Sequence, residues 1–97
     1  MHQIRFLPRA EKYIKKEKDK VLKEKIRLAI LKIKENPYIG KVKKGDLTGI
    51  YGFDVFYNKT NYEISYQIYE SKQIVVIILV GTRENFYDEL KKYISNL

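Results

Sequence analysis

The side chains that this 97-residue chain offers for chemistry are lysine, arginine, tyrosine and the carboxylates. Cysteine is absent and the single histidine is His2, so a thiolate nucleophile or a histidine-based metal site is not expected. The remaining groups suffice for metal-free cleavage of RNA. In that reaction a base takes the 2′-hydroxyl proton, the oxygen attacks the adjacent phosphorus, and an acid protonates the leaving 5′-oxygen. DNA lacks the internal nucleophile, so such a site would cut RNA only.

The most informative segment is 80–87, which runs from the end of an apolar stretch into a helical pattern. Arg83 could hold a phosphate through two parallel hydrogen bonds, and the N-terminus of the helix would add amide donors. Tyr87 could supply a phenolic proton or stack on a base. The alternatives are that Arg83 pairs on the surface with Glu84 or Asp88, and that Tyr87 packs in the core.

Further candidates lie in a basic loop and on a predicted strand. Lys41, Lys43 and Lys44 precede the sheet, where they could contact backbone phosphates without reading sequence, or could simply be solvated. Glu63 is on the second face of its strand, and a positive surround could keep it ionised as a base. The alternative for Glu63 is a plain surface glutamate.

Two helices are expected after a short strand at residues 3–7, because apolar residues recur at helical spacing. The first pattern comprises Ala10, Tyr13 and Ile14, and the second comprises Leu22, Ile26, Ala29, Ile30 and Ile33. Pro8 opens the first helix, and Pro37 ends the second near Asn36, since the residue before a proline avoids the α region. Together they predict a helical hairpin.

From Leu47 onward the pattern alternates, which is typical of strands. Residues 51–57 and 62–68 predict an antiparallel hairpin with its turn at 58–61, and the apolar run 74–80 predicts a central strand covered on both faces. We therefore predict one α+β domain over residues 1–97, in the order β-α-α-β-β-β-α: a four-stranded, mainly antiparallel sheet with an N-terminal helical hairpin and a C-terminal helix. Helices at about 9–35 and 85–96 should cover one face, and the basic loop or a partner the other.

Charge is distributed unevenly along the chain. Residues 1–45 carry a net charge of +10 and residues 46–97 a net charge of −2. Such a field favours nucleic acid, an anionic membrane or an acidic protein segment as the partner, although exposed lysines also serve simply to solvate helix faces. The absence of cysteine suits the cytoplasm, and no signal peptide or membrane anchor is recognisable.

The order of elements, together with three local segments, resembles the RelE/ParE superfamily of toxins from toxin–antitoxin pairs. Those segments are 46–51, 62–66 and the strand exit Val80-Gly81-Thr82-Arg83, which is followed by the aromatic pair Phe86-Tyr87. The resemblance covers essentially the whole chain. It implies a cognate antitoxin partner, no cofactor, and activity either as a ribosome-dependent mRNA endonuclease or as a gyrase poison.

The resemblance also assigns roles to individual residues. It places Arg83 at the scissile phosphate, makes Tyr87 the nearest counterpart of a contributing C-terminal tyrosine, and gives Lys41, Lys43 and Lys44 to RNA binding. Many nucleases of the family carry an arginine where this chain has Glu63, after Tyr62. The leading hypothesis is an mRNA endoribonuclease acting on the ribosome. The alternatives are a gyrase inhibitor of the ParE kind and a non-toxic binding module of the same fold.

Overall fold

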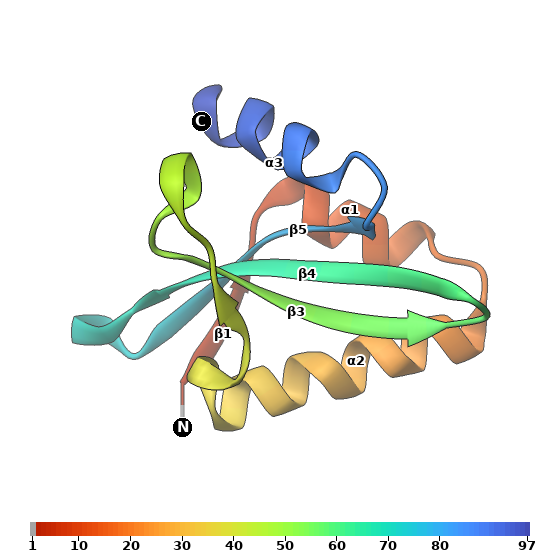
Figure 1. The fold of residues 1–97 in the computed structure, drawn as a ribbon. Coiled ribbons are helices and arrows are strands. Elements are labelled where there is room, and N and C mark those ends of the chain that lie inside the picture. The colour runs from red at the N-terminus through yellow and green to blue at the C-terminus, as the bar shows by residue number, and fades with distance from the viewer. Residues whose placement is uncertain (1) are drawn as a thin grey trace.

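A computed structural model, which describes residues 2–97, has a mixed five-stranded sheet with helices on both faces (Figure 1). The strands are β1 (Gln3–Phe6), β2 (Lys41–Val42), β3 (Ile50–Tyr57), β4 (Thr60–Tyr69) and β5 (Ile74–Thr82). Their spatial order is β1-β5-β4-β3-β2, with β1 parallel to β5 and the other neighbours antiparallel. The predicted α+β class and order of long elements are confirmed, but the sheet has five strands and not four.

The additional strand, β2, lies in the segment that we expected to be a loop. Lys41 pairs with Gly52 and Val42 with Tyr51, so β2 adds a two-residue edge strand to the sheet next to β3. Two residues are too few to show an alternating pattern, and both side chains are exposed. β2 therefore exists because of its backbone pairing with β3, which the sequence pattern could not reveal.

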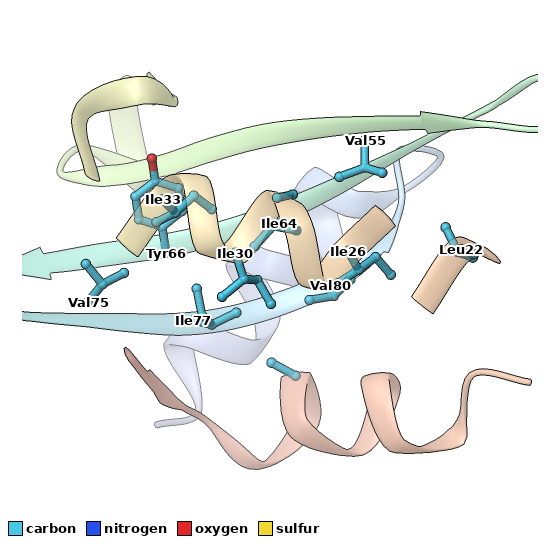
Figure 2. Packing of buried hydrophobic residues seen from close by; sticks show 12 residues of the cluster. Leu22, Ile26, Ile30, Ile33, Val55, Ile64, Tyr66, Val75, Ile77 and Val80 are labelled. Atoms are coloured by element: carbon cyan, nitrogen blue, oxygen red, sulfur yellow. The ribbon is translucent and has the colours of Figure 1, made fainter. Parts of the chain in front are cut away.

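Helices α1 (Pro8–Lys16) and α2 (Lys20–Glu35) form the predicted hairpin. Asp19 caps α2, because its side chain accepts hydrogen bonds from the backbone amides of Val21 at 3.0 Å and Leu22 at 3.2 Å. The apolar stripe of α2 packs on one face of the sheet (Figure 2). The main core cluster consists of Ala10, Leu22, Ile26, Ala29, Ile30, Ile33, Val55, Ile64, Tyr66, Val75, Ile77 and Val80.

The C-terminal helix α3 (Phe86–Ser95) lies on the opposite face of the sheet from α2 (Figure 1). It forms a second core cluster, made up of Leu47, Ile50, Ile78, Leu79, Phe86 and Leu90. Our expectation that all helices share one face was therefore wrong. The reason is β5, whose unbroken apolar run presents Val80 to the first cluster and Leu79 to the second, so each face needs a cover.

Strand β5 is interior and covered on both faces, as predicted, but the middle position of the sheet belongs to β4. Glu63 of β4 pairs with Asp54 of β3 on one side and with Gly81 of β5 on the other. Because side chains alternate along a strand, Glu63 points to the α3-bearing face, opposite Ile64.

Within residues 2–97 no helix is both long and apolar enough to cross a bilayer.

Candidate functional site

A pocket of about 330 Å³ opens where β2, β3, β4 and the exit of β5 meet. It is lined by Ile39, Gly40, Lys41, Val42, Lys43, Gly52, Phe53, Asp54, Glu63 and Arg83. Four of the residues proposed from the sequence, namely Lys41, Lys43, Glu63 and Arg83, thus come together from three separate segments. The site has an apolar wall and a floor of alternating charges.

Glu63 is the buried acid of this pocket, with only 4% of the residue exposed. The alternative of a plain surface glutamate is therefore wrong. Lys43 Nζ lies 2.7 Å from Glu63 Oε2, without the angles of a hydrogen bond, so the contact is a largely buried ion pair. Gly52 makes room for it. A Cβ atom at position 52 would lie 2.7 Å from Glu63 Oε2 and 3.2 Å from Lys43 Nζ.

Arg83 lies at the open side of the pocket. Its backbone amide donates to the carbonyl of Asn61 at 2.8 Å, which fixes the chain directly after β5. Its Nη1 donates to Asp54 Oδ2 at 2.9 Å, and its Nε is 3.8 Å from Glu63 Oε1. The partner of Arg83 is therefore Asp54, not Glu84 or Asp88. The side chain remains 57% exposed, so the guanidinium can reach a ligand.

The four charged groups form a row, in the order Asp54, Arg83, Glu63 and Lys43, in which each cation is next to a carboxylate. Two positive and two negative charges leave the row formally neutral. A carboxylate can accept a proton and a guanidinium can stabilise an oxyanion, so the row contains a base and a charge donor side by side. This pairing is suited to acid–base chemistry at a phosphodiester.

The loop that carries the pocket lysines is held by Tyr66, a fully buried residue of β4. Its hydroxyl donates to the carbonyl of Pro37 at 2.6 Å and accepts from the amide of Gly40 at 3.0 Å. Burial, above all, raises the pKa of Tyr66 to about 12. Gly40 has to be small here, since a Cβ atom would lie 2.5 Å from the Tyr66 hydroxyl and 2.8 Å from the carbonyl of Gly52.

Two of the proposed residues, Lys44 and Tyr87, do not line the pocket. Tyr87 is 48% exposed and not packed in the core, and the ammonium of Lys91 lies 5.4 Å from the centre of its ring. Lys91 also pairs with Asp46 at 3.2 Å, and this contact raises the pKa of Lys91. Across residues 2–97, no three His, Asp or Glu side chains come together as a metal site would require.

Sequence reasoning missed Asp54 and Gly52. For Asp54 the sequence did contain a signal, the turn of the β3–β4 hairpin, which we predicted to span four residues. The turn is made by Asn58 and Lys59 alone, both with positive φ (50° and 61°), as in a two-residue type I′ turn. Reading Asn58 as the start of a two-residue turn would have set Tyr57 opposite Thr60, and so Asp54 opposite Glu63.

Comparison with known proteins gives a consistent result. Residues 4–91 match the family described as "ParE-like toxin of type II bacterial toxin-antitoxin system". No curated protein sequence matches the chain significantly.

Among solved structures, an arginine-to-alanine double mutant of the E. coli toxin RelE in the free state aligns with a TM-score of 0.76. It is 21% identical, and the match covers 98% of this chain and 95% of that one. The intact E. coli RelBE toxin–antitoxin complex has a TM-score of 0.71 at 23% identity, covering 84% and 95% of the two chains. The RelBE2 toxin–antitoxin complex of Mycobacterium tuberculosis has a TM-score of 0.65 at 25% identity, covering 84% and 98%.

Proposed function

We propose that this chain, which belongs to the family of ParE-like toxins of type II bacterial toxin–antitoxin systems, is a metal-independent endoribonuclease that cuts mRNA in the ribosomal A site. Cleavage would inhibit translation in the cytoplasm until a cognate antitoxin neutralises the toxin. The observation that carries this proposal is the contact between Arg83 and Glu63 in one pocket, a solvent-accessible cation beside a buried carboxylate.

The proposed division of roles follows from exposure and position. Glu63 would accept the proton of the 2′-hydroxyl, and Arg83 would stabilise the charge that develops on the phosphorane, because its guanidinium keeps its charge at working pH. Lys41 and Lys43, which line the pocket, would hold the RNA backbone. Tyr87 is exposed on α3 and does not line the pocket, and its proposed contribution is base stacking or proton donation.

The antitoxin that we propose as partner is an acidic protein segment. Residues 1–45 carry the +10 net charge, most of it on α1 and α2. Among these lysines α2 also exposes Val21, Leu28 and Leu31. Basic residues interspersed with exposed apolar ones suit an acidic amphipathic segment. The similarity to solved toxin–antitoxin complexes from E. coli and M. tuberculosis supports a partner of this class.

One observation favours a second candidate function, inhibition of DNA gyrase without any cleavage. Two of the three pocket cations, Lys43 and Arg83, are already paired with carboxylates, so the pocket attracts a polyanion less than an all-basic site would. A toxin that acts by binding a protein would need no free cation at this place.

Induction of the toxin followed by mapping of transcript ends separates the two functions. For the ribonuclease, wild type should produce new ends on ribosome-bound mRNA, and Arg83→Ala should remove them. Loss of one preorganised group that stabilises the charge of the transition state raises the activation free energy by about 3 kcal/mol, which is roughly a hundredfold in rate. Arg27→Ala is the matched control, because Arg27 is also an exposed arginine paired with a carboxylate but lies outside the pocket.

A toxin that arrests growth and inhibits supercoiling by purified gyrase, without new transcript ends, would contradict the ribonuclease proposal. An Arg83→Ala protein that still cuts mRNA at the wild-type rate would show that the catalytic centre lies elsewhere.

A further inference from the structure

The two ion pairs at the pocket differ in how readily they can exchange partners. Lys43 and Glu63 are largely buried, with 18% and 5% of their side chains exposed. Arg83 and Asp54 are 57% and 45% exposed. Water screens the second pair and competes for both of its partners, so it can open without exposing the core. The buried pair, in contrast, cannot lose one member without leaving a charge unpaired.

We propose that Asp54 is an intramolecular competitor for phosphate. Its carboxylate occupies the place on Arg83 that a phosphate oxygen takes when RNA binds, and it thereby sets the affinity and selectivity of the pocket. The inference rests on the proposed function only insofar as the ligand is a nucleic-acid phosphate. It concerns binding and does not require that the phosphodiester be cleaved.

The geometry supports exchange in place. Asp54 accepts a hydrogen bond from Arg83 Nη1 at 2.9 Å, and carboxylates and phosphates both accept from a guanidinium. The backbone of Arg83 is anchored to Asn61, and Arg83 Nε lies 3.8 Å from Glu63 Oε1, so the side chain keeps a second contact at the pocket when Nη1 changes its partner. A phosphate can therefore replace Asp54 without any movement of the fold.

Asp54 is not explained by the stability of the sheet. It lies directly opposite Glu63 in the β3–β4 ladder, and like charges at such positions are destabilising. Aspartate is also among the residues that strands disfavour. Arg83 offsets this repulsion because it contacts both carboxylates. We therefore explain the aspartate at position 54 by its ion pair with Arg83, which occupies the guanidinium in the absence of a phosphate.

The consequence is a selective pocket. A ligand that offers only one phosphate group must displace Asp54 and gains little binding free energy. An RNA that also contacts Lys41 and the apolar wall compensates for the lost ion pair. Asp54 would therefore weaken binding to non-cognate polyanions more than binding to a correctly placed RNA.

The test is equilibrium binding of a fluorescent single-stranded DNA oligonucleotide, which has no 2′-hydroxyl and cannot be cut by the proposed reaction. Four proteins form a double-mutant cycle: wild type, Asp54→Asn, Arg83→Ala and the double variant. Glu24→Gln is the matched control, because it frees Arg27 from an exposed carboxylate pair and raises the net charge by the same unit outside the pocket.

Asp54→Asn should tighten binding by about two- to fivefold, the range expected for release of an exposed ion pair. The gain should vanish in the Arg83→Ala background and should exceed that of Glu24→Gln. Thermal unfolding confirms that each variant is folded, and Asp54→Thr, with a good strand-forming residue, repeats the test if Asp54→Asn is unstable.

Equal gains from Asp54→Asn and Glu24→Gln would overturn the inference, since the effect would then be one of net charge alone. A gain that persists without Arg83, or no gain at all, would also overturn it. If Asp54→Asn tightens binding through Arg83 while no variant cuts RNA, the competition by Asp54 stands and the ribonuclease proposal fails.

Discussion

The Tyr66 hydroxyl donates a 2.6 Å hydrogen bond to the carbonyl of Pro37, which ties the middle strand of the sheet to the loop that carries the pocket lysines. Because the same hydroxyl accepts from the amide of Gly40, one oxygen serves two backbone groups. The position of Lys41, the next residue, depends on this connection.

Tyr66→Phe should destabilise the protein by about 1–3 kcal/mol, since the amide of Gly40 and the carbonyl of Pro37 lose their buried partner. Chemical denaturation measures the effect. Tyr69→Phe is the control, because the Tyr69 hydroxyl donates to Gln67 in an exposed contact and should cost little. Equal costs for the two variants would show that the Tyr66 hydroxyl anchors nothing.

Alkaline pH should weaken the fold through the same residue. The pKa of Tyr66 is raised to about 12 from the ordinary value of 10.0, mainly by burial. Its contribution is complete below pH 10 and declines as the pH rises toward 12, because the unfolded chain releases the proton first. Unfolding at several pH values, with absorbance to follow tyrosine ionisation, tests this. Tyr66→Phe should show a shallower decline.

Gly52→Ala should disrupt the charged floor of the pocket. The new methyl group would lie 2.7 Å from Glu63 Oε2, so the Glu63 carboxylate has to shift and its contact with Lys43 is disturbed. We expect a loss of about 1–3 kcal/mol in stability and weaker RNA binding. Gly81→Ala is the matched control on the other side of Glu63, where a Cβ atom meets the Phe86 ring at an ordinary 3.6 Å. Comparable damage from Gly81→Ala would show that the effect does not depend on the Glu63–Lys43 pair.

Glu63→Gln should reduce RNA cleavage by about 10²–10⁴-fold if Glu63 is the general base, because glutamine keeps the size but cannot accept the proton. It also leaves Lys43 without its buried counter-charge, so stability must be measured in parallel. Single-turnover cleavage of ribosome-bound mRNA is the measurement. A folded Glu63→Gln protein that cuts at the wild-type rate would assign the base to another group.

Association with the antitoxin should slow as salt rises from low to physiological ionic strength, since steering by the basic helices is screened. Stopped-flow mixing measures the rate. Lys23→Gln on α2 should lower the rate, whereas Lys72→Gln, in the short turn between β4 and β5, should not. An association rate that does not respond to salt would place the docking surface away from α1 and α2.

Periodic patterns predicted the long elements well. The stripe from Leu22 to Ile33 specifies a helix of several turns, and alternation specifies β3 and β4. The face covered by α3 could not be predicted, because the run in β5 is apolar on both sides and gives no preference.

The candidate site was predicted in part, on physical grounds that can be stated. Arg83 and Glu63 were found from residue type and place on a strand, and the structure brings both into one pocket. Asp54 was missed because its importance depends on a register set by a turn with lysine at a positive φ, where glycine is usual. Gly52 was missed because its role is to leave space for a contact that only the folded chain makes.

The parallel pairing of β1 with β5 means that the sheet can be completed only late in the synthesis of the chain. Gln3 pairs with Ile74 and Phe6 with Ile77, so β1, the first strand to be synthesised, can pair only after β5, the last strand, has been synthesised. Such distant pairing is slow to form, because the intervening chain must be ordered first. Arg83 follows β5, so the pocket and the sheet are completed by the same final stretch of chain. A product that terminates before residue 74 would therefore lack β5 and Arg83, and with them both the complete sheet and the complete pocket.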